Sequence, residues 1–195
     1  MTESEIVVQS GEELRVTVDT NLLDASGLQS LSAAVKDLPA EIAMVTVSER
    51  ESGTPSTEFQ LLTEAAVWGE SEWGRSVWAG PIHETLVLGE ARLGRAVLGF
   101  DGTPNLMESI LTIIANGSFP KKGDREHLTD PQRRQLRDAM ILEAHTRNRR
   151  DIFVTKDERG FIRNGRRAAL EQLCATRILT LDEFVDYCQQ RLKEP

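Results

Sequence analysis

The sequence predicts an α/β fold built on a mainly parallel central sheet. Short apolar segments rich in Val and Ile alternate with helical patterns along the 195 residues. One of these segments, IAMVTVS at 42–48, is almost continuously apolar, as expected for a strand that is covered on both faces. The predicted order is strand, helix, strand, helices, strand, helix, strand, helix. The length favours one domain, residues 1–195, that carries an insertion.

The first predicted strand ends in a carboxylate. IVVQSGEELRVTVD is typical of two short strands around a Gly turn, or of a single strand at Val16–Asp19 after a lead-in. Leucines at helical spacing then predict a helix from Asn21 to about Leu38, which Pro39 ends. The strand at 42–48 follows, and ERESGTPST after it is predicted to be a loop.

The middle of the chain, about 58–128, is predicted to be a helical insertion because Ala, Leu and Glu dominate it. DGTPNLM indicates one helix start, with Thr103 as N-cap and Pro104 in the first position. Trp68, Trp73 and Trp78 recur every five residues, which does not form a helical stripe. Packing within the protein is the simpler interpretation of these residues, and base stacking or a partner surface is the alternative.

The last third contains the clearest signals. TDPQRRQLRDAM predicts a long helix capped by Thr129 or Asp130, with Pro131 at its first position. IFVT at 152–155 and RILTL near 177 are predicted strands, with a helix over 166–174 between them. A capping box from Thr180 to Glu183 begins a final helix.

Charge and composition limit the possible functions. The net charge is −8, but residues 133–167 carry 11 basic and 5 acidic side chains, so a basic patch for a nucleic acid is possible there. Solvated helix faces are the alternative explanation. No apolar run is long enough for a membrane span, and the acidic first residues do not form a signal peptide. Cys174 and Cys188 are typical of reduced thiols, so we expect a cytoplasmic protein without a membrane partner.

Acidic residues follow three of the predicted strands. These are Asp19, Glu49 and Asp157, and Asp138 lies on the helix that leads into the strand before Asp157. Functional residues of parallel sheets gather at the carboxyl ends of the strands, so the four acids are expected to converge. A hard cation such as Mg²⁺ or Mn²⁺ would relieve their repulsion, and such ions promote phosphodiester hydrolysis by activating a bound water.

Each acid also has a structural alternative. Asp19 could cap the helix that begins at Asn21, and Asp157 could be a turn residue. Asp138 could pair with Arg134 or Arg137, and Glu51 competes with Glu49 for the second position. The metal-binding interpretation therefore depends on whether the acids come together.

The chain resembles the PIN-domain nucleases in three segments. VTVDTNLLD at 16–24 is similar to the family's first strand ending in Asp-Thr-Asn, and IAMVTVSERESG at 42–53 is similar to the segment with its second acid. DAMILEAHTRNRRDIFVTKDERGF at 138–161 is similar to the helix Asp followed by a strand ending in Thr-x-Asp. The resemblance implies a three-layer α/β/α sandwich whose metal ligands are Asp19, Glu49, Asp138 and Asp157. It also places Thr155 beside the fourth acid, and Thr20 and Asn21 beside the metal site.

The resemblance implies an Mg²⁺- or Mn²⁺-dependent endoribonuclease that acts on single-stranded or structured RNA. A toxin with an antitoxin-type protein partner is a special case, and a homodimer is a further expectation. The insertion at 58–128 is absent from small toxin-type members. The alternative is a catalytically silent PIN-like module that binds a protein.

Arginines in the last third are candidates for contact with a phosphate backbone, because their planar fork bonds phosphate in a bidentate manner. The candidates are Arg134, Arg147, Arg149, Arg150, Arg163 and Arg166, with Arg133 and Arg167 beside them. Other sites are not indicated: His83, His127 and His145 share no spacing, and no Gly-rich nucleotide motif is present. The strand-end Asp of the haloacid-dehalogenase-like phosphatases requires a second Asp two residues later, where Asn21 stands here.

Overall fold

The structure, a computed structural model, describes most of the chain outside its N-terminus and its middle. The described residues are 13–45, 48, 60–62, 65–66, 68–70, 76–78, 97–98, 103–121, 125 and 128–193. For 65–66, 68–70, 76–78, 97–98 and 103–105, the description covers the backbone alone.

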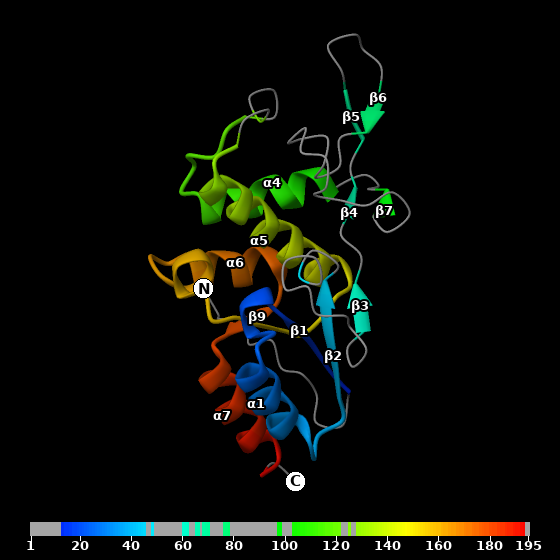
Figure 1. Cartoon of the computed structure of the whole chain (residues 1–195), viewed down its shortest axis with the longest axis vertical. Helices are drawn as coiled ribbons and strands as arrows, with labels where there is room; N and C mark the ends of the chain where they lie inside the picture. The colour runs from blue at the N-terminus through cyan, green and yellow to red at the C-terminus, as the bar shows by residue number, and fades with distance from the viewer. Residues whose placement is uncertain are drawn as a thin grey trace.

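A five-stranded sheet, parallel throughout, forms the centre of the fold and confirms the predicted α/β class (Figure 1). Its strand order is β3-β2-β1-β8-β9. The strands are β1 (Leu14–Val18), β2 (Ala40–Val45), β3 (Gln60–Leu62), β8 (Ile152–Val154) and β9 (Arg177–Leu179). The strands predicted near 16–19, 42–48, 152–155 and 177 are therefore present.

Helices pack on both faces of this sheet. On one face, α1 (Ala25–Val35) and α7 (Leu181–Arg191) cover a core that includes Val16 and Val18 of β1. On the other face, α4 (Thr103–Ile114), α5 (Asp130–Arg147) and α6 (Arg166–Cys174) cover a core that includes Ala43 of β2 and Phe153 of β8. Two short helical turns follow strands, namely η1 (Thr20–Leu22) after β1 and η3 (Glu158–Ile162) after β8.

The helix ends show why the sequence forms these elements. In α5, Thr129 is the cap, as one of the two alternatives predicted, and it forms a capping box with Gln132; Pro131 is the second residue of the helix rather than the first. In α7, Thr180 and Glu183 form the predicted box. The first long helix begins later than predicted, because Asp24 rather than Asp19 caps it by accepting a hydrogen bond from Gly27 N at 2.6 Å.

The middle of the chain differs from the predicted helical insertion. Its described part contains β3, which joins the central sheet, and four further short strands: β4 (Ala65–Ala66), β5 (Trp68–Glu70), β6 (Ser76–Trp78) and β7 (Val97–Leu98). β4 pairs with β7, and β5 pairs with β6 so that Trp68 and Trp78 stand opposite each other. Only α4 confirms a predicted helix, and Trp73 lies outside the described residues.

Within the described part of the chain, no helix combines the length and the apolar character needed to cross a membrane.

Candidate active site

The strand order reverses direction between β1 and β8. The chain runs from β1 to its neighbour β2 on one side, and from β8 to its neighbour β9 on the other, while β1 and β8 lie next to each other. Such a reversal is a topological switch point, and ligands of open α/β sheets bind there, beyond the carboxyl ends of the strands. Asp19 follows β1 and Thr155 follows β8, so both lie at this point.

The backbone brings Asp19 and Thr155 side by side. Val18 and Val154 are register partners, and Asp19 N donates a hydrogen bond of 3.0 Å to Val154 O. Val18 and Val154 belong to the core under α1 and α7. Because side chains alternate along a strand, the next residues face the opposite side, toward α5. Asp138 lies on α5, so one face of the sheet collects the acids.

Asp19 is buried, with only 3% of its surface exposed. Three short hydrogen bonds hold its carboxylate. Its Oδ1 accepts from Thr20 N at 2.7 Å, and its Oδ2 accepts from Thr155 Oγ1 at 2.6 Å and from Asn21 Nδ2 at 2.8 Å. Donors to a carboxylate favour its charged form. The bond from Thr20 also caps η1, so the capping interpretation of Asp19 is partly correct, although the bonds from Asn21 and Thr155 lie outside any cap.

Asn21 connects the two strand ends. Its Nδ2 also lies 3.3 Å from Thr155 Oγ1, and its Oδ1 accepts from Lys156 N at 2.9 Å. Lys156 Nζ in turn bonds Asp24 Oδ2 at 2.8 Å, and this bond, with those from Gly27 and Ser26, holds the pKa of Asp24 well below its usual range. The Asp-Thr-Asn segment thus fixes the loop after β8 to the turn after β1.

Asp157 and Asp138 approach each other across Gly160. Asp157 Oδ1 accepts from Arg159 N and Gly160 N, both at 2.9 Å, which caps η3. No described residue donates a hydrogen bond to Asp157 Oδ2. A Cβ on Gly160 would lie 2.6 Å from Asp157 Oδ2 and 3.7 Å from Asp138 Oδ2, so the separation of these oxygens is at most the sum of those distances. Only glycine leaves this space open.

Asp138 and Asp157 each have a carboxylate oxygen near the Cβ position of Gly160, and the Thr155 hydroxyl links Asp19 to the backbone of Asp157. We call Asp19, Asp138 and Asp157 the acidic edge. Glu49 and its competitor Glu51 lie outside the described residues. Among the side chains that are described, no three from His, Cys, Asp and Glu gather closely enough to form a metal site by themselves. The close pair is Asp138 and Asp157, and hydrogen bonds hold Asp19 beside it.

This pair fits the divalent ion that the sequence predicts. Carboxylate oxygens are the ligands of hard cations, and Mg²⁺ is often bound by one or two carboxylates while it keeps several waters. Asp157 Oδ2 lacks a donor among the described residues, and the absent side chain of Gly160 leaves room beside it. Asp138 and Asp157 are therefore the residues that would hold the ion directly, and Asp19 lies where it could bind through water.

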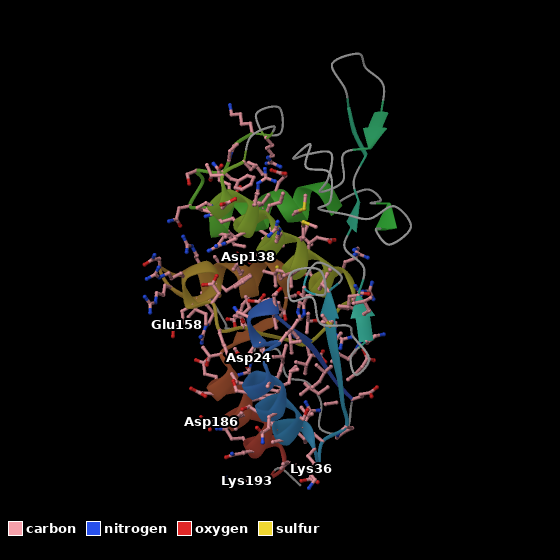
Figure 2. The ribbon with its side chains drawn as sticks, viewed as in Figure 1. Asp24, Lys36, Asp138, Glu158, Asp186 and Lys193 are labelled. Atoms are coloured by element: carbon pink, nitrogen blue, oxygen red, sulfur yellow. The ribbon has the colours of Figure 1, made fainter. Side chains whose placement is uncertain are left out.

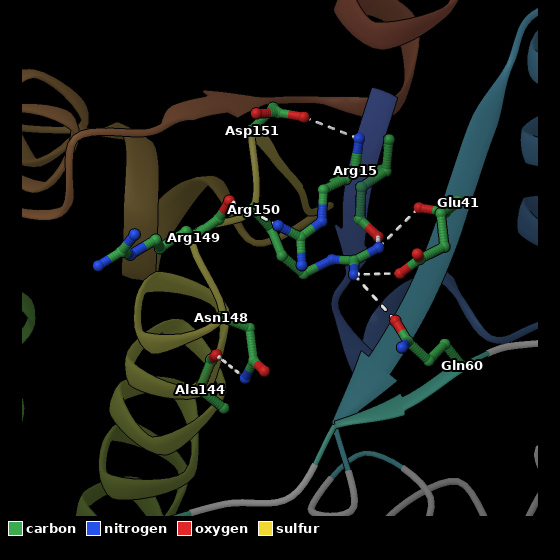
Figure 3. A network of polar contacts seen from close by, with 9 residues as sticks. Arg15, Glu41, Gln60, Ala144, Asn148, Arg149, Arg150 and Asp151 are labelled. Carbon is green, nitrogen blue, oxygen red and sulfur yellow. Dashed lines mark hydrogen bonds and ion pairs between the residues drawn. The ribbon is translucent and has the colours of Figure 1, made fainter. Parts of the chain in front are cut away.

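The prediction that Arg150 contacts a nucleic acid is wrong. Its side chain is buried, and its Nη2 donates to the Val16 and Glu41 carbonyls at 3.0 and 2.7 Å (Figure 3). Its Nη1 bonds the side chains of Glu41 and Gln60. Burial lowers the pKa of Arg150, and the hydrogen bond and charge of Glu41 act in the opposite direction. Arg150 links the start of β8 to β1, β2 and β3, so it cannot contact a phosphate.

The other predicted arginines differ in how their side chains are used. Arg134 and Arg149 are exposed. Arg147 pairs with the buried Glu143, Arg163 pairs with Glu158, and Arg166 Nη1 donates to the Arg159 carbonyl. Figure 2 shows Asp138 and Glu158 near the middle of the molecule and Lys36 and Lys193 at its lower end.

Three residues of the site were missed by sequence reasoning. Gly160 had no signal beyond that of a loop breaker, and Lys156 and Arg159 had none beyond charge. His145, for which the sequence indicated no site, is a core residue: it is fully buried, and its Nε2 lies 2.6 Å from Thr176 Oγ1. His83 and His127 lie outside the described residues.

Comparison with known proteins adds no family assignment: no protein-family model matches the sequence, and no curated protein matches it.

Proposed function

We propose that this protein is a metal-dependent nuclease of PIN type, with the three-layer α/β/α arrangement of that family, and that it is an endoribonuclease. One observation carries the proposal. At the topological switch point, Asp19 is fixed by Thr155 and Asn21, and Asp138 and Asp157 each place a carboxylate oxygen beside Gly160. The segments that provide these residues are those in which the sequence resembles the PIN nucleases.

The residues have separate roles in this proposal. Asp138 and Asp157 would hold Mg²⁺ or Mn²⁺, and the second acid of the sequence, Glu49, is proposed as a further ligand. Asp19 would orient a water at the ion, and hydrogen bonds from Thr20, Asn21 and Thr155 fix its carboxylate. Thr155 is a positioning residue, since its hydroxyl donates to Asp19 and accepts from Asp157 N at 2.9 Å.

A bound divalent ion would supply charge stabilisation at the phosphorus and a water of lowered pKa. The protein's share of the chemistry is to hold its carboxylates in place before the substrate arrives. The backbone donors to Asp157 and the hydroxyl donor to Asp19 serve that purpose, because they compensate the charge without filling the space between Asp138 and Asp157.

Asp157→Asn is the sharpest test. The new amide oxygen can replace Oδ1 and keep both backbone hydrogen bonds, while its NH₂ group replaces Oδ2 and points toward Asp138. Asp19→Asn is less suitable, because both carboxylate oxygens of Asp19 face donors and an NH₂ group would oppose one of them.

We expect purified protein to cleave labelled single-stranded RNA with Mn²⁺ or Mg²⁺, and EDTA or Asp157→Asn to abolish cleavage. Single-stranded DNA run in parallel identifies the preferred nucleic acid. Lys36→Ala, a change of one exposed residue at the far end of the molecule, is the control and should cleave like wild type (Figure 2). Cleavage that survives in Asp157→Asn, or an inert wild type that binds no Mn²⁺ by calorimetry, would refute the proposal. The inert result would favour the silent, protein-binding module.

A further inference from the structure

The basic residues in and around η3, from Lys156 to Arg167, are not equally available to a ligand. Arg163 bonds Glu158 Oε2 at 2.7 and 3.0 Å, and Arg167 bonds both oxygens of Glu183 at 2.9 Å. Lys156 bonds Asp24, and Arg166 donates to a backbone carbonyl. These cations are compensated or occupied by the protein itself.

Arg159 is different. Its side chain is exposed, and it forms no hydrogen bond or ion pair with any residue that the structure describes. Its backbone, however, is fixed at both ends. Its N–H donates to Asp157 Oδ1 at 2.9 Å, and its carbonyl accepts from Arg166 Nη1. The backbone of Arg159 is thus fixed beside Asp157, a predicted metal ligand, and the guanidinium is left in solvent.

The position of the Arg159 backbone limits where the guanidinium can reach. The backbone nitrogen of Arg159 lies 2.9 Å from Asp157 Oδ1, and the other oxygen of the same carboxylate faces Asp138. An extended Arg side chain spans about 6–7 Å, so its fork can reach a phosphate oxygen that approaches the acidic edge. A negatively charged polymer also needs a nearby cation, because the acids themselves repel it until the ion is bound.

We infer that Arg159 binds a non-bridging phosphate oxygen of a single-stranded polynucleotide beside the scissile bond, and that Arg166 acts as its positioning residue. The inference rests on the proposed nuclease function. It assigns the phosphate contact to a residue that the sequence analysis did not select, and it assigns Arg166 a supporting role in place of direct contact. Because phosphates are common to RNA and DNA, the contact contributes affinity without sequence preference.

The test measures binding without cleavage. All variants are made in the Asp157→Asn protein, and fluorescence anisotropy with a labelled single-stranded RNA gives Kd between 50 and 300 mM salt. We expect Arg159→Ala to raise Kd about tenfold and to lower the slope of log K against log salt by about 0.7, the value for one lost phosphate contact on a single strand. Arg159→Lys should keep the slope and lose part of the affinity, since it retains the charge without the fork.

Lys36→Ala removes one exposed charge far from Asp138 and should leave the slope unchanged, which separates a local contact from a loss of net charge (Figure 2). Arg166→Ala should raise Kd by less than Arg159→Ala and add little to it in the double variant, because both act through one contact. If the parent binds RNA and Arg159→Ala leaves Kd and slope unchanged, the inference is wrong and the nuclease proposal stands. If the parent and the wild type both fail to bind RNA, the nuclease proposal fails and the inference with it.

Discussion

Gly160→Ala should close the space between Asp138 and Asp157. The backbone of Gly160 does not lie in the left-handed region, so alanine meets no backbone strain and the effect comes from its Cβ alone. That atom would lie 2.6 Å from Asp157 Oδ2 and 3.2 Å from Asp157 Cγ, whereas ordinary contact begins at 3.4 Å. The carboxylate must therefore move by close to an ångström.

The carboxylate of Asp157 cannot move without loss. Its Oδ1 accepts two backbone hydrogen bonds of 2.9 Å, and a rotation that withdraws Oδ2 from the new methyl group also displaces Oδ1. Overpacking of this kind costs about 1–3 kcal/mol in free energy of unfolding, or roughly 2–10 °C in Tm for a chain of this length. The ion site should be lost as well, because the methyl group occupies the space beside the ligand oxygen.

The assay is thermal unfolding in EDTA and in Mn²⁺. An ion at about 100 times its Kd stabilises the wild type by about 2.7 kcal/mol, so its Tm should rise by roughly 5–10 °C. We expect no Mn²⁺-dependent rise in Gly160→Ala. Gly117→Ala is the matched control: its φ of 71° makes alanine strained, but nothing lies within 4 Å of the added Cβ. It should lower Tm and keep the Mn²⁺-dependent rise. A full rise in Gly160→Ala would refute the placement of the ion between Asp138 and Asp157.

Three other predictions follow from contacts described above. Asn21→Ala removes the link between Asp19 and the loop after β8. The rate of RNA cleavage should therefore fall about tenfold, while the free energy of unfolding falls by only about 1 kcal/mol. Equal cleavage rates in the variant and the wild type would show that the link does not position Asp19. Arg150→Met leaves two buried carbonyls and Glu41 without their donor, and urea unfolding should show a loss of about 3 kcal/mol; a loss below 1 kcal/mol would contradict this account of Arg150. Burial, with the charges of Arg150 and Arg15, lowers the pKa of His145 to about 3, so its contribution to stability is complete above pH 6.5 and decreases as pH falls from there toward 3. Between pH 7 and pH 5, the free energy of unfolding measured in urea should fall by about 2 kcal/mol more for the wild type than for His145→Gln. Identical pH profiles of the two proteins would refute this prediction.

The sequence predicted the central sheet because the signals for its strands and helices are local. Val-rich strands, capping boxes and Pro at helix starts depend on neighbouring residues, so the strands near 16, 42, 152 and 177 and the helix α5 were predicted correctly. The rule that parallel strands end at one edge applies to Asp19 and Asp157, whereas Asp138 lies on α5 and was expected beside them because that helix leads into the strand before Asp157.

Other features depend on contacts between distant segments, and the sequence did not reveal them. β3 has three residues in a stretch of high helix propensity, and it is a strand because β2 pairs with it. Arg149 and Arg150 are adjacent and identical in type, yet only Arg150 is buried, since its partners come from β1, β2 and Gln60. Gly160 matters through its distance to Asp138, which is 22 positions away in the sequence.

The hydrogen bond between Thr155 and Asp19 joins residues 136 positions apart, which has a consequence for the order of folding. Contacts with such long sequence separation close late, because the entropy of the intervening loop must be overcome first. During synthesis, β1 and β2 can pair long before β8 leaves the ribosome, but Asp19 then lacks both Thr155 and the loop that carries Asp157. The acidic edge therefore assembles only after more than three quarters of the chain has been translated, and nascent chains shorter than this cannot form it.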